Sequence, residues 1–213
     1  MTLIRKGTIL MPPIVSEEHR EERKLAILHA AKEVFIRKGF HAATIQDIID
    51  ESGISRGGVY TYFQNTEDIF IELLRRRDQE DAATLAAILP SETSNWEALC
   101  ALLEEIQVGI EQQKDPLVPA IYEYYFTMGR GTKKHIALLE NRIEQTRQYL
   151  VRILQRGVDD GEYSPKVPIE DVARTIITFG DGIYVNSFHL GANNIKIKEQ
   201  FDAFRNYLAG VLL

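Results

Sequence analysis

The polar side chains of residues 55–61 have the types and spacing that suit contact with a nucleic acid. Ser55 is expected to cap a short helix in which Val59 and Phe63, four residues apart, face inward. The opposite side would offer a cation, hydroxyl groups and a glycine that admits close approach of the backbone, at Arg56, Gly57, Tyr60 and Thr61. Such groups can bind phosphates and the edges of bases. The pattern indicates the second helix of a helix-turn-helix.

Catalytic and metal-binding chemistry finds little support elsewhere in the chain. Cys100 is the single cysteine and has no base near it, and no phosphate-binding loop occurs. Asp181, between two glycines, is expected to be a buried carboxylate, which suits a ligand hydrogen bond or a helix kink better than a general base. The five histidines, of which His29 is expected on a helix surface, show no metal-binding spacing: His19, His29, His41, His135 and His189. We therefore expect a protein that is not an enzyme and uses no cofactor or metal.

Local signals define the helices that would position the polar face. Thr44 and Asp47 have the spacing of a capping box, which predicts a helix over residues 44–51. Gly53 lies in the turn before the second short helix, predicted over residues 55–63. An earlier helix would begin at Ser16 and end at Gly39. Together these elements predict a three-helix head near residues 16–64.

Helical periodicity continues through the rest of the chain, so the predicted fold class is all-α. A linking helix would begin at a cap formed by Asn65 or Thr66 and run to about residue 89. Pro116 and Pro119 predict that one of the later helices is short or bent and leaves room beside it. The later helices are predicted over residues 94–113, 116–129, 132–158, 168–190 and 196–212.

Composition is that of an ordinary globular protein: 213 residues, 45 % hydrophobic and 26 % charged. The net charge of −6 is uneven, because residues 1–65 carry 9 − 8 = +1 and residues 66–213 carry 16 − 23 = −7. Residues 1–15 make a poor signal peptide and are expected to form a loosely ordered arm. No segment approaches the roughly 20 apolar residues needed to span a bilayer. We expect a cytoplasmic protein with no membrane partner.

The segment from residue 20 to residue 75 closely resembles the TetR family of bacterial transcriptional regulators. The matching pattern runs through Ala30-Ala31, Phe35, Gly39-Phe40, Thr44, Asp47-Ile48, Ser52 to Gly57, Val59-Tyr60, Tyr62-Phe63 and Glu67 to Phe70. Thr66 departs from the lysine often found there, and Gly58 adds a second glycine to the short helix. The resemblance implies DNA contacts by Thr44, Gln46, Ser55, Arg56, Gly57, Gly58, Tyr60, Thr61 and Tyr62.

The resemblance also implies a division into a DNA-binding domain over residues 16–75, with its motif at 44–63, and a regulatory and dimerisation domain over residues 76–213. Partners would then be a palindromic double-stranded DNA operator, a second copy of the chain and a small apolar or amphipathic effector that releases a repressor from its operator. The alternative is a helical small-molecule-binding protein that does not bind DNA, with an enzyme as a third reading.

Two apolar features of residues 76–213 could serve these roles. The segments 169–180 and 201–211 carry more apolar residues than one core contact requires, which predicts a four-helix interface between two copies. The alternative is that both segments only cover the core of one chain. Aromatic residues at helical spacing are the candidates for effector binding: Trp96, Tyr122, Tyr125, Phe126 and Phe179. The alternative for each is a place in the core, where aromatic residues at this spacing are more often found.

Overall fold

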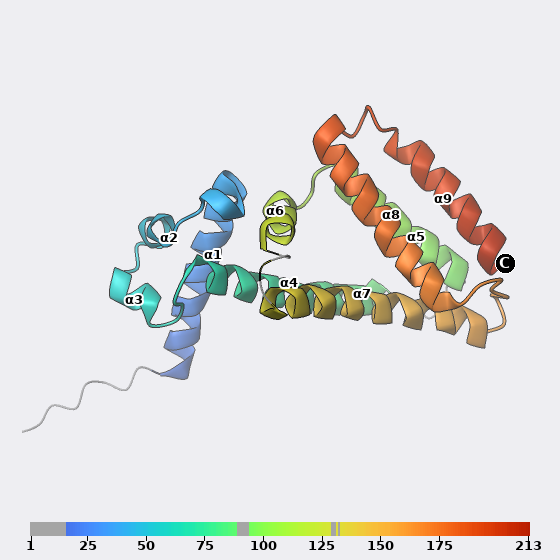
Figure 1. Ribbon diagram of the computed structural model, residues 1–213. Helices are drawn as coiled ribbons and strands as arrows, with labels where there is room; N and C mark the ends of the chain where they lie inside the picture. The colour runs from blue at the N-terminus through green and yellow to red at the C-terminus, as the bar shows by residue number, and fades with distance from the viewer. Residues whose placement is uncertain (1–15, 89–93, 129–130, 132) are drawn as a thin grey trace, which may run out of the picture.

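The computed structural model describes residues 16–88, 94–128, 131 and 133–213, and over these residues it contains helices and no β-strand (Figure 1). The predicted arm at residues 1–15 lies outside the described residues. The all-α prediction is confirmed, and most helix ends fall within about two residues of their predicted positions. The helices are α1 (Glu17–Ala42), α2 (Ile45–Ser52), α3 (Arg56–Tyr60), α4 (Thr66–Ile88), α5 (Asn95–Glu111), α6 (Val118–Met128), α7 (Lys133–Asp159), α8 (Ile169–Leu190) and α9 (Ile197–Leu212).

Helix α1 begins and breaks where the sequence predicts. The Ser16 hydroxyl accepts a hydrogen bond from the His19 amide at 3.2 Å, which caps the first turn. Gly39 leaves helical geometry with φ of 76° and ψ of 174°, so the last turn is set at an angle to the rest. His29 lies exposed on this helix, as expected.

The core of the head is aromatic and includes a helix from much later in the chain. The Phe35 and Phe70 rings meet edge to face at 4.7 Å, which joins α1 to α4. The Phe40 ring meets the ring of Tyr124, on α6, at 4.8 Å. Val59 and Phe63 are buried in the same cluster, as predicted. Helix α6 therefore packs with the head, although it lies beyond the predicted division at residue 75.

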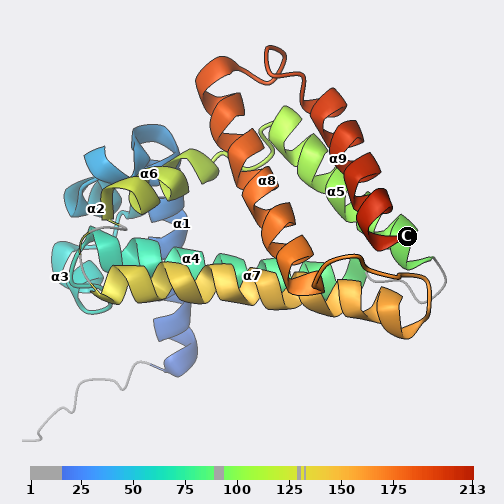
Figure 2. The ribbon, with the colours of Figure 1, turned by 45° about the vertical axis from the view of Figure 1, so that its right-hand side comes forward.

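The second core lies at the other end of the molecule, among α5, α7, α8 and α9 (Figure 2). It includes apolar residues of 169–180 and 201–211, for which an interface with a second copy remains a prediction. Most of them are buried inside one chain, because α8 and α9 pack against α5 and α7: Val172, Ala173, Ile176, Phe201, Phe204 and Leu208. Periodicity reveals a buried face but does not reveal its partner.

Helices α4 and α7 run side by side between the two ends in both views (Figures 1 and 2). The Arg142 guanidinium of α7 pairs with the Asp78 carboxylate of α4 at 2.7 Å. Across the residues with a described placement, no helix is both long enough and apolar enough to cross a membrane.

Candidate nucleic-acid interface

The start of α2 is fixed by the predicted capping box. The Asp47 amide donates to the Thr44 hydroxyl at 3.2 Å, and the Thr44 amide donates to the Asp47 carboxylate at 3.0 Å. Lys38 of α1 bonds to the same carboxylate at 2.6 Å. The bonds from Lys38 and Thr44 lower the pKa of Asp47 to about 2. The cap therefore stays ionised at neutral pH and ties α2 to α1.

The turn after α2 depends on a glycine. Gly53 has a φ of 66°, in the left-handed region, and its amide donates to the Ile49 carbonyl at 3.1 Å. A second ion pair, between Arg37 of α1 and Glu51 of α2 at 2.8 Å, holds the end of α2. This geometry sets the angle at which α3 leaves the turn.

Helix α3 is shorter than predicted. Ser55 caps it as expected, accepting from the Gly58 amide at 3.2 Å, but regular helix ends at Tyr60 rather than Phe63. Hydrogen-bonded turns continue beyond it, because the Phe63 amide donates to the Val59 carbonyl at 3.1 Å. The chain has to turn here, since Asn65 caps the next helix by accepting from the Asp68 amide at 2.8 Å.

The solvent face of α3 carries Arg56 and Tyr60. The Arg56 guanidinium lies 5.6 Å from the centre of the Tyr60 ring, and that tyrosine is 41 % exposed. Thr61 is also exposed, and its hydroxyl donates to the Gly57 carbonyl at 2.8 Å. On the opposite side Val59 is fully buried. The two faces are those that the sequence predicted.

The two glycines of α3 have different surroundings. A Cβ atom at Gly57 would meet nothing within 4 Å, so this backbone is open to a partner. A Cβ atom at Gly58 would lie 2.7 Å from the Cγ2 atom of Ile54, which leaves no room for a side chain there. Tyr62 is half-buried against the core of the head. Gly58 and Tyr62 are therefore less accessible than the other predicted contact residues.

The remaining predicted contacts come from α2 and its cap. Thr44 and Gln46 are both exposed, and the Gln46 side-chain amide donates to the Asp50 carboxylate at 2.8 Å. Arg56 is the single cation within α3. Because the nearby Arg37 and Lys38 are engaged in ion pairs with α2, this surface offers mainly hydroxyls, amides and one guanidinium.

Comparison with known proteins decides the family. The model described as "Bacterial regulatory proteins, tetR family" matches residues 27–73, and "Tetracyclin repressor-like, C-terminal domain" matches residues 98–198. The HTH-type transcriptional regulator YfiR of Bacillus subtilis is 34 % identical over 95 % of this chain and 98 % of its own. The chain belongs to the TetR family. It is a DNA-binding transcriptional regulator, as its helix-turn-helix and its relatives' names agree.

Other TetR-family proteins are similar over most of their length. The HTH-type transcriptional repressor KstR2 of Mycobacterium tuberculosis is 28 % identical over 72 % of this chain and 76 % of its own. A TetR regulator from Haloarcula marismortui shares the fold with a TM-score of 0.79 at 21 % identity, covering 91 % of this chain and all of the other. A regulator from Cytophaga hutchinsonii has a TM-score of 0.78 at 16 % identity, covering 91 % and 96 %.

The aromatic residues predicted to bind an effector fall in three places. Tyr122 and Phe126 lie on the wall of a cavity of about 340 Å³. Tyr125 is packed against the core of the head, with the Arg142 guanidinium 5.8 Å from its ring centre. Trp96 and Phe179 pack against the second core, where the Phe179 ring stacks on Phe204 at 4.0 Å. The structure therefore does not bring the five residues to one site.

The cavity lies between α1, α6 and α8. Pro116 and Pro119 contribute to its wall, which confirms the room predicted beside the short helix α6. Its remaining wall is mostly aromatic and aliphatic, with Phe35 and Ile36 from α1 and Val185 and Phe188 from α8. A concave, largely apolar recess with few polar groups is typical of a small-molecule site.

Two side chains of α6 join the walls of this cavity. The Glu123 carboxylate accepts from the amides of Phe40 at 2.7 Å and His41 at 3.1 Å, next to the break in α1. The Tyr122 hydroxyl donates to the Asp181 carboxylate of α8 at 2.7 Å. Asp181 is exposed, which corrects the expectation that it is buried. Its neighbours Gly180 and Gly182 add no side chains to cover it.

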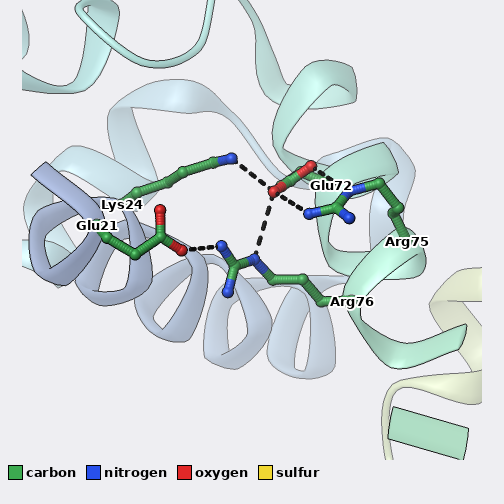
Figure 3. A network of polar contacts seen from close by, with 5 residues as sticks. All are labelled: Glu21, Lys24, Glu72, Arg75 and Arg76. Carbon is green, nitrogen blue, oxygen red and sulfur yellow. Dashed lines mark hydrogen bonds and ion pairs between the residues drawn. The ribbon is translucent and has the colours of Figure 1, made fainter. Parts of the chain in front are cut away.

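Sequence reasoning did not find the Glu123 bonds, because their partners are more than 80 residues away. It also did not find the ion-pair network between α1 and α4 (Figure 3). There the Glu72 carboxylate binds Lys24 at 2.6 Å and Arg75 at 2.9 Å, and Arg76 bridges Glu72 and Glu21. The bonds from Arg75 and Lys24 lower the pKa of Glu72 to about 2. Only the spacings of Glu72 with Arg75 and with Arg76 along α4 signal part of it.

Proposed function

We propose that the protein is a homodimeric repressor that binds a palindromic operator and leaves it when a small apolar or amphipathic molecule binds beside α6. The observation that carries DNA recognition is the exposed face of α3, where Arg56, Tyr60 and Thr61 lie opposite the buried Val59. A guanidinium at this position can bind a guanine edge or a phosphate. Bacterial DNA lies in the cytoplasm, so the same proposal places the protein there.

The predicted contact residues serve this proposal in two ways. Thr44, Gln46, Ser55, Arg56, Gly57, Tyr60 and Thr61 are exposed and can touch the duplex directly. Gly58 and Tyr62, which are half-buried, would support the shape of α3 and contact DNA at the edge of the surface.

Dimerisation is proposed through the apolar groups that α8 and α9 leave uncovered. Tyr207 is 52 % exposed and Leu190 is 59 % exposed. Cβ atoms at Gly180 and Gly210 would meet nothing within 4 Å, so a partner helix could approach closely. A two-fold dimer would place its α3 helices in successive major grooves, roughly 34–36 Å apart or a multiple of this spacing.

The effector is proposed to bind in the cavity between α1, α6 and α8. Tyr122 and Phe126 are the two predicted ligand residues that can touch a molecule there. Trp96, Tyr125 and Phe179 would contact an effector only at a second site, or act through packing. For induction, the ligand has to favour the released state over the bound state by about 1–3 kcal/mol.

The test is a gel-retardation assay, in which the protein is mixed with DNA duplexes from the region upstream of its own gene. Arg56→Ala is expected to lower operator affinity by about 1–3 kcal/mol, and Tyr60→Phe to lower it less. Arg152→Ala, an exposed substitution on α7, is the control and should bind as the unaltered protein does. Unchanged affinity for both α3 variants would show that another face contacts DNA. A monomer at micromolar concentration in sedimentation would contradict the dimer.

The alternative is a helical ligand-binding protein that does not bind DNA. The cavity would serve either role, so only DNA binding separates them. Failure to retard any upstream duplex, together with direct binding of a small molecule, would favour this alternative.

A further inference from the structure

The cavity between α1, α6 and α8 is lined by several aromatic rings, two of which remain largely exposed. Phe126 is 68 % exposed and Phe188 is 63 % exposed, although both lie on the cavity wall. On the same wall the Tyr122 and Tyr184 rings stack at 4.8 Å with an angle of 8° between their planes. The cavity therefore offers several π-systems from α6 and α8 to one guest.

The charge of the wall has one sign. Glu123 is the acidic residue on it, and the described residues of the wall include no lysine or arginine. The other ionisable groups there are His189 and the hydroxyls of Tyr122 and Tyr184. A second carboxylate, that of Asp181, accepts a hydrogen bond from the Tyr122 hydroxyl at 2.7 Å. An anionic guest would meet these carboxylates without a lysine or arginine to bind its charge.

We propose that this cavity takes a small apolar cation, an aryl or alkyl ammonium, with its charge near Glu123 and its apolar part against the rings of α6 and α8. Aromatic faces attract an ammonium group, and the attraction is stronger where water is excluded. A volume of about 340 Å³ is at the lower end of the range of ligand sites, so the guest is small. This inference rests on the proposed function, because it names the class of the effector.

The position of the cavity gives this ligand direct access to the DNA-binding head. Phe35, Ile36 and Gly39 of α1 form one side of the wall. The Glu123 carboxylate holds the end of α1 through the Phe40 and His41 amides. An ammonium group that draws this carboxylate toward itself weakens those two bonds. The ligand would thereby loosen the head from α6 at the point where it binds.

The experiment measures binding to the full chain in the absence of DNA, by isothermal titration calorimetry. The probe is benzyltrimethylammonium, and its matched competitors are the neutral isostere neopentylbenzene and the anion 3-phenylpropionate. We expect the cation to bind at least about tenfold more tightly than the anion. Glu123→Gln should weaken cation binding about tenfold and leave the neutral isostere unchanged. Glu104→Gln, an exposed substitution on α5, should change neither the affinity for the cation nor the affinity for the neutral isostere.

A second variant keeps the test decisive if Glu123→Gln does not fold. Phe126→Leu retains an apolar side chain but removes an aromatic ring. It should therefore weaken binding of the cation more than binding of the neutral isostere. Equal binding of all three probes, preference for the anion, or no binding of the cation would each overturn the proposal. Because no DNA is present, these results do not depend on the operator. Operator release by an uncharged or anionic compound would leave the proposed function standing and refute the cationic class.

Discussion

Replacing Gly39 by alanine should destabilise the protein through two separable effects. The first is backbone strain, because φ of 76° with ψ of 174° lies in a region that essentially only glycine occupies. The second is a collision, because a Cβ atom built at this position runs into the Glu123 carboxylate. The collision would force that carboxylate away from the Phe40 and His41 amides.

The expected magnitude follows from these two effects. Strain of this kind costs about 1–3 kcal/mol, and a hydrogen bond to a charged group contributes about 1.5–3 kcal/mol. Glu123 is only half-buried, so water replaces part of the lost bonding and the lower values apply. We expect Gly39→Ala to lower the free energy of unfolding by about 3 kcal/mol. For a chain of this length, that is a fall in Tm of roughly 6–12 °C.

The assay is a double-mutant cycle followed by calorimetry and urea unfolding. In a Glu123→Ala background nothing remains for the new Cβ atom to displace, so Gly39→Ala should cost only its strain, about 1–2 kcal/mol. Gly161→Ala is the matched control, since Gly161 has a φ of 74° and nothing within 4 Å of the position a Cβ atom would take. Strictly additive effects, or a Gly39→Ala cost no larger than that of Gly161→Ala, would refute the reasoning.

Three further predictions concern the head. Gly58→Ala should lower the free energy of unfolding by about 1–2 kcal/mol in urea titrations, because its Cβ atom would collide with the Cγ2 atom of Ile54. Gly57→Ala, whose Cβ atom meets nothing within 4 Å, should change the free energy of unfolding by no more than about 0.5 kcal/mol. It should weaken operator binding in retardation assays, since the new methyl group would lie on the face proposed to contact DNA. Glu72, whose folded pKa is lowered from 4.5 to about 2, should stabilise the fold fully above pH 4.5 and lose this contribution as the pH falls toward 2. In the Glu72→Gln variant, the free energy of unfolding should therefore depend less on pH between 4.5 and 2.

The features that could be predicted from the sequence are those that neighbouring residues determine. Thr44 and Asp47 are three residues apart, so their capping box could be read directly and is confirmed. The solvent face of α3 was predictable because Val59 and Phe63, four residues apart, define the buried side. The end of α3 was not, because hydrogen-bonded turns rather than regular helix follow Tyr60 as far as Phe63.

The features that could not be predicted depend on which surfaces meet in three dimensions. The apolar residues of α8 and α9 indicated a buried face, but tertiary packing sets which of them pack on α5 and α7 and which stay uncovered. Nothing in the α6 sequence indicated that this helix completes the core of the head. Glu123 resembled any surface glutamate, because the amides that it binds belong to a helix break 82 and 83 residues earlier.

Three consecutive residues of α6 connect it to three different helices. The Tyr122 hydroxyl binds Asp181 of α8, the Glu123 carboxylate binds the end of α1, and the Tyr124 hydroxyl binds Glu67 of α4 at 3.1 Å. Consecutive side chains leave a helix about 100° apart, so these contacts point in different directions around one axis. A rotation or shift of α6 therefore cannot preserve all three. Both α1 and the start of α4 hold the helix-turn-helix. A molecule that binds in the cavity and displaces α6 would therefore change the position of α3 relative to the rest of the protein.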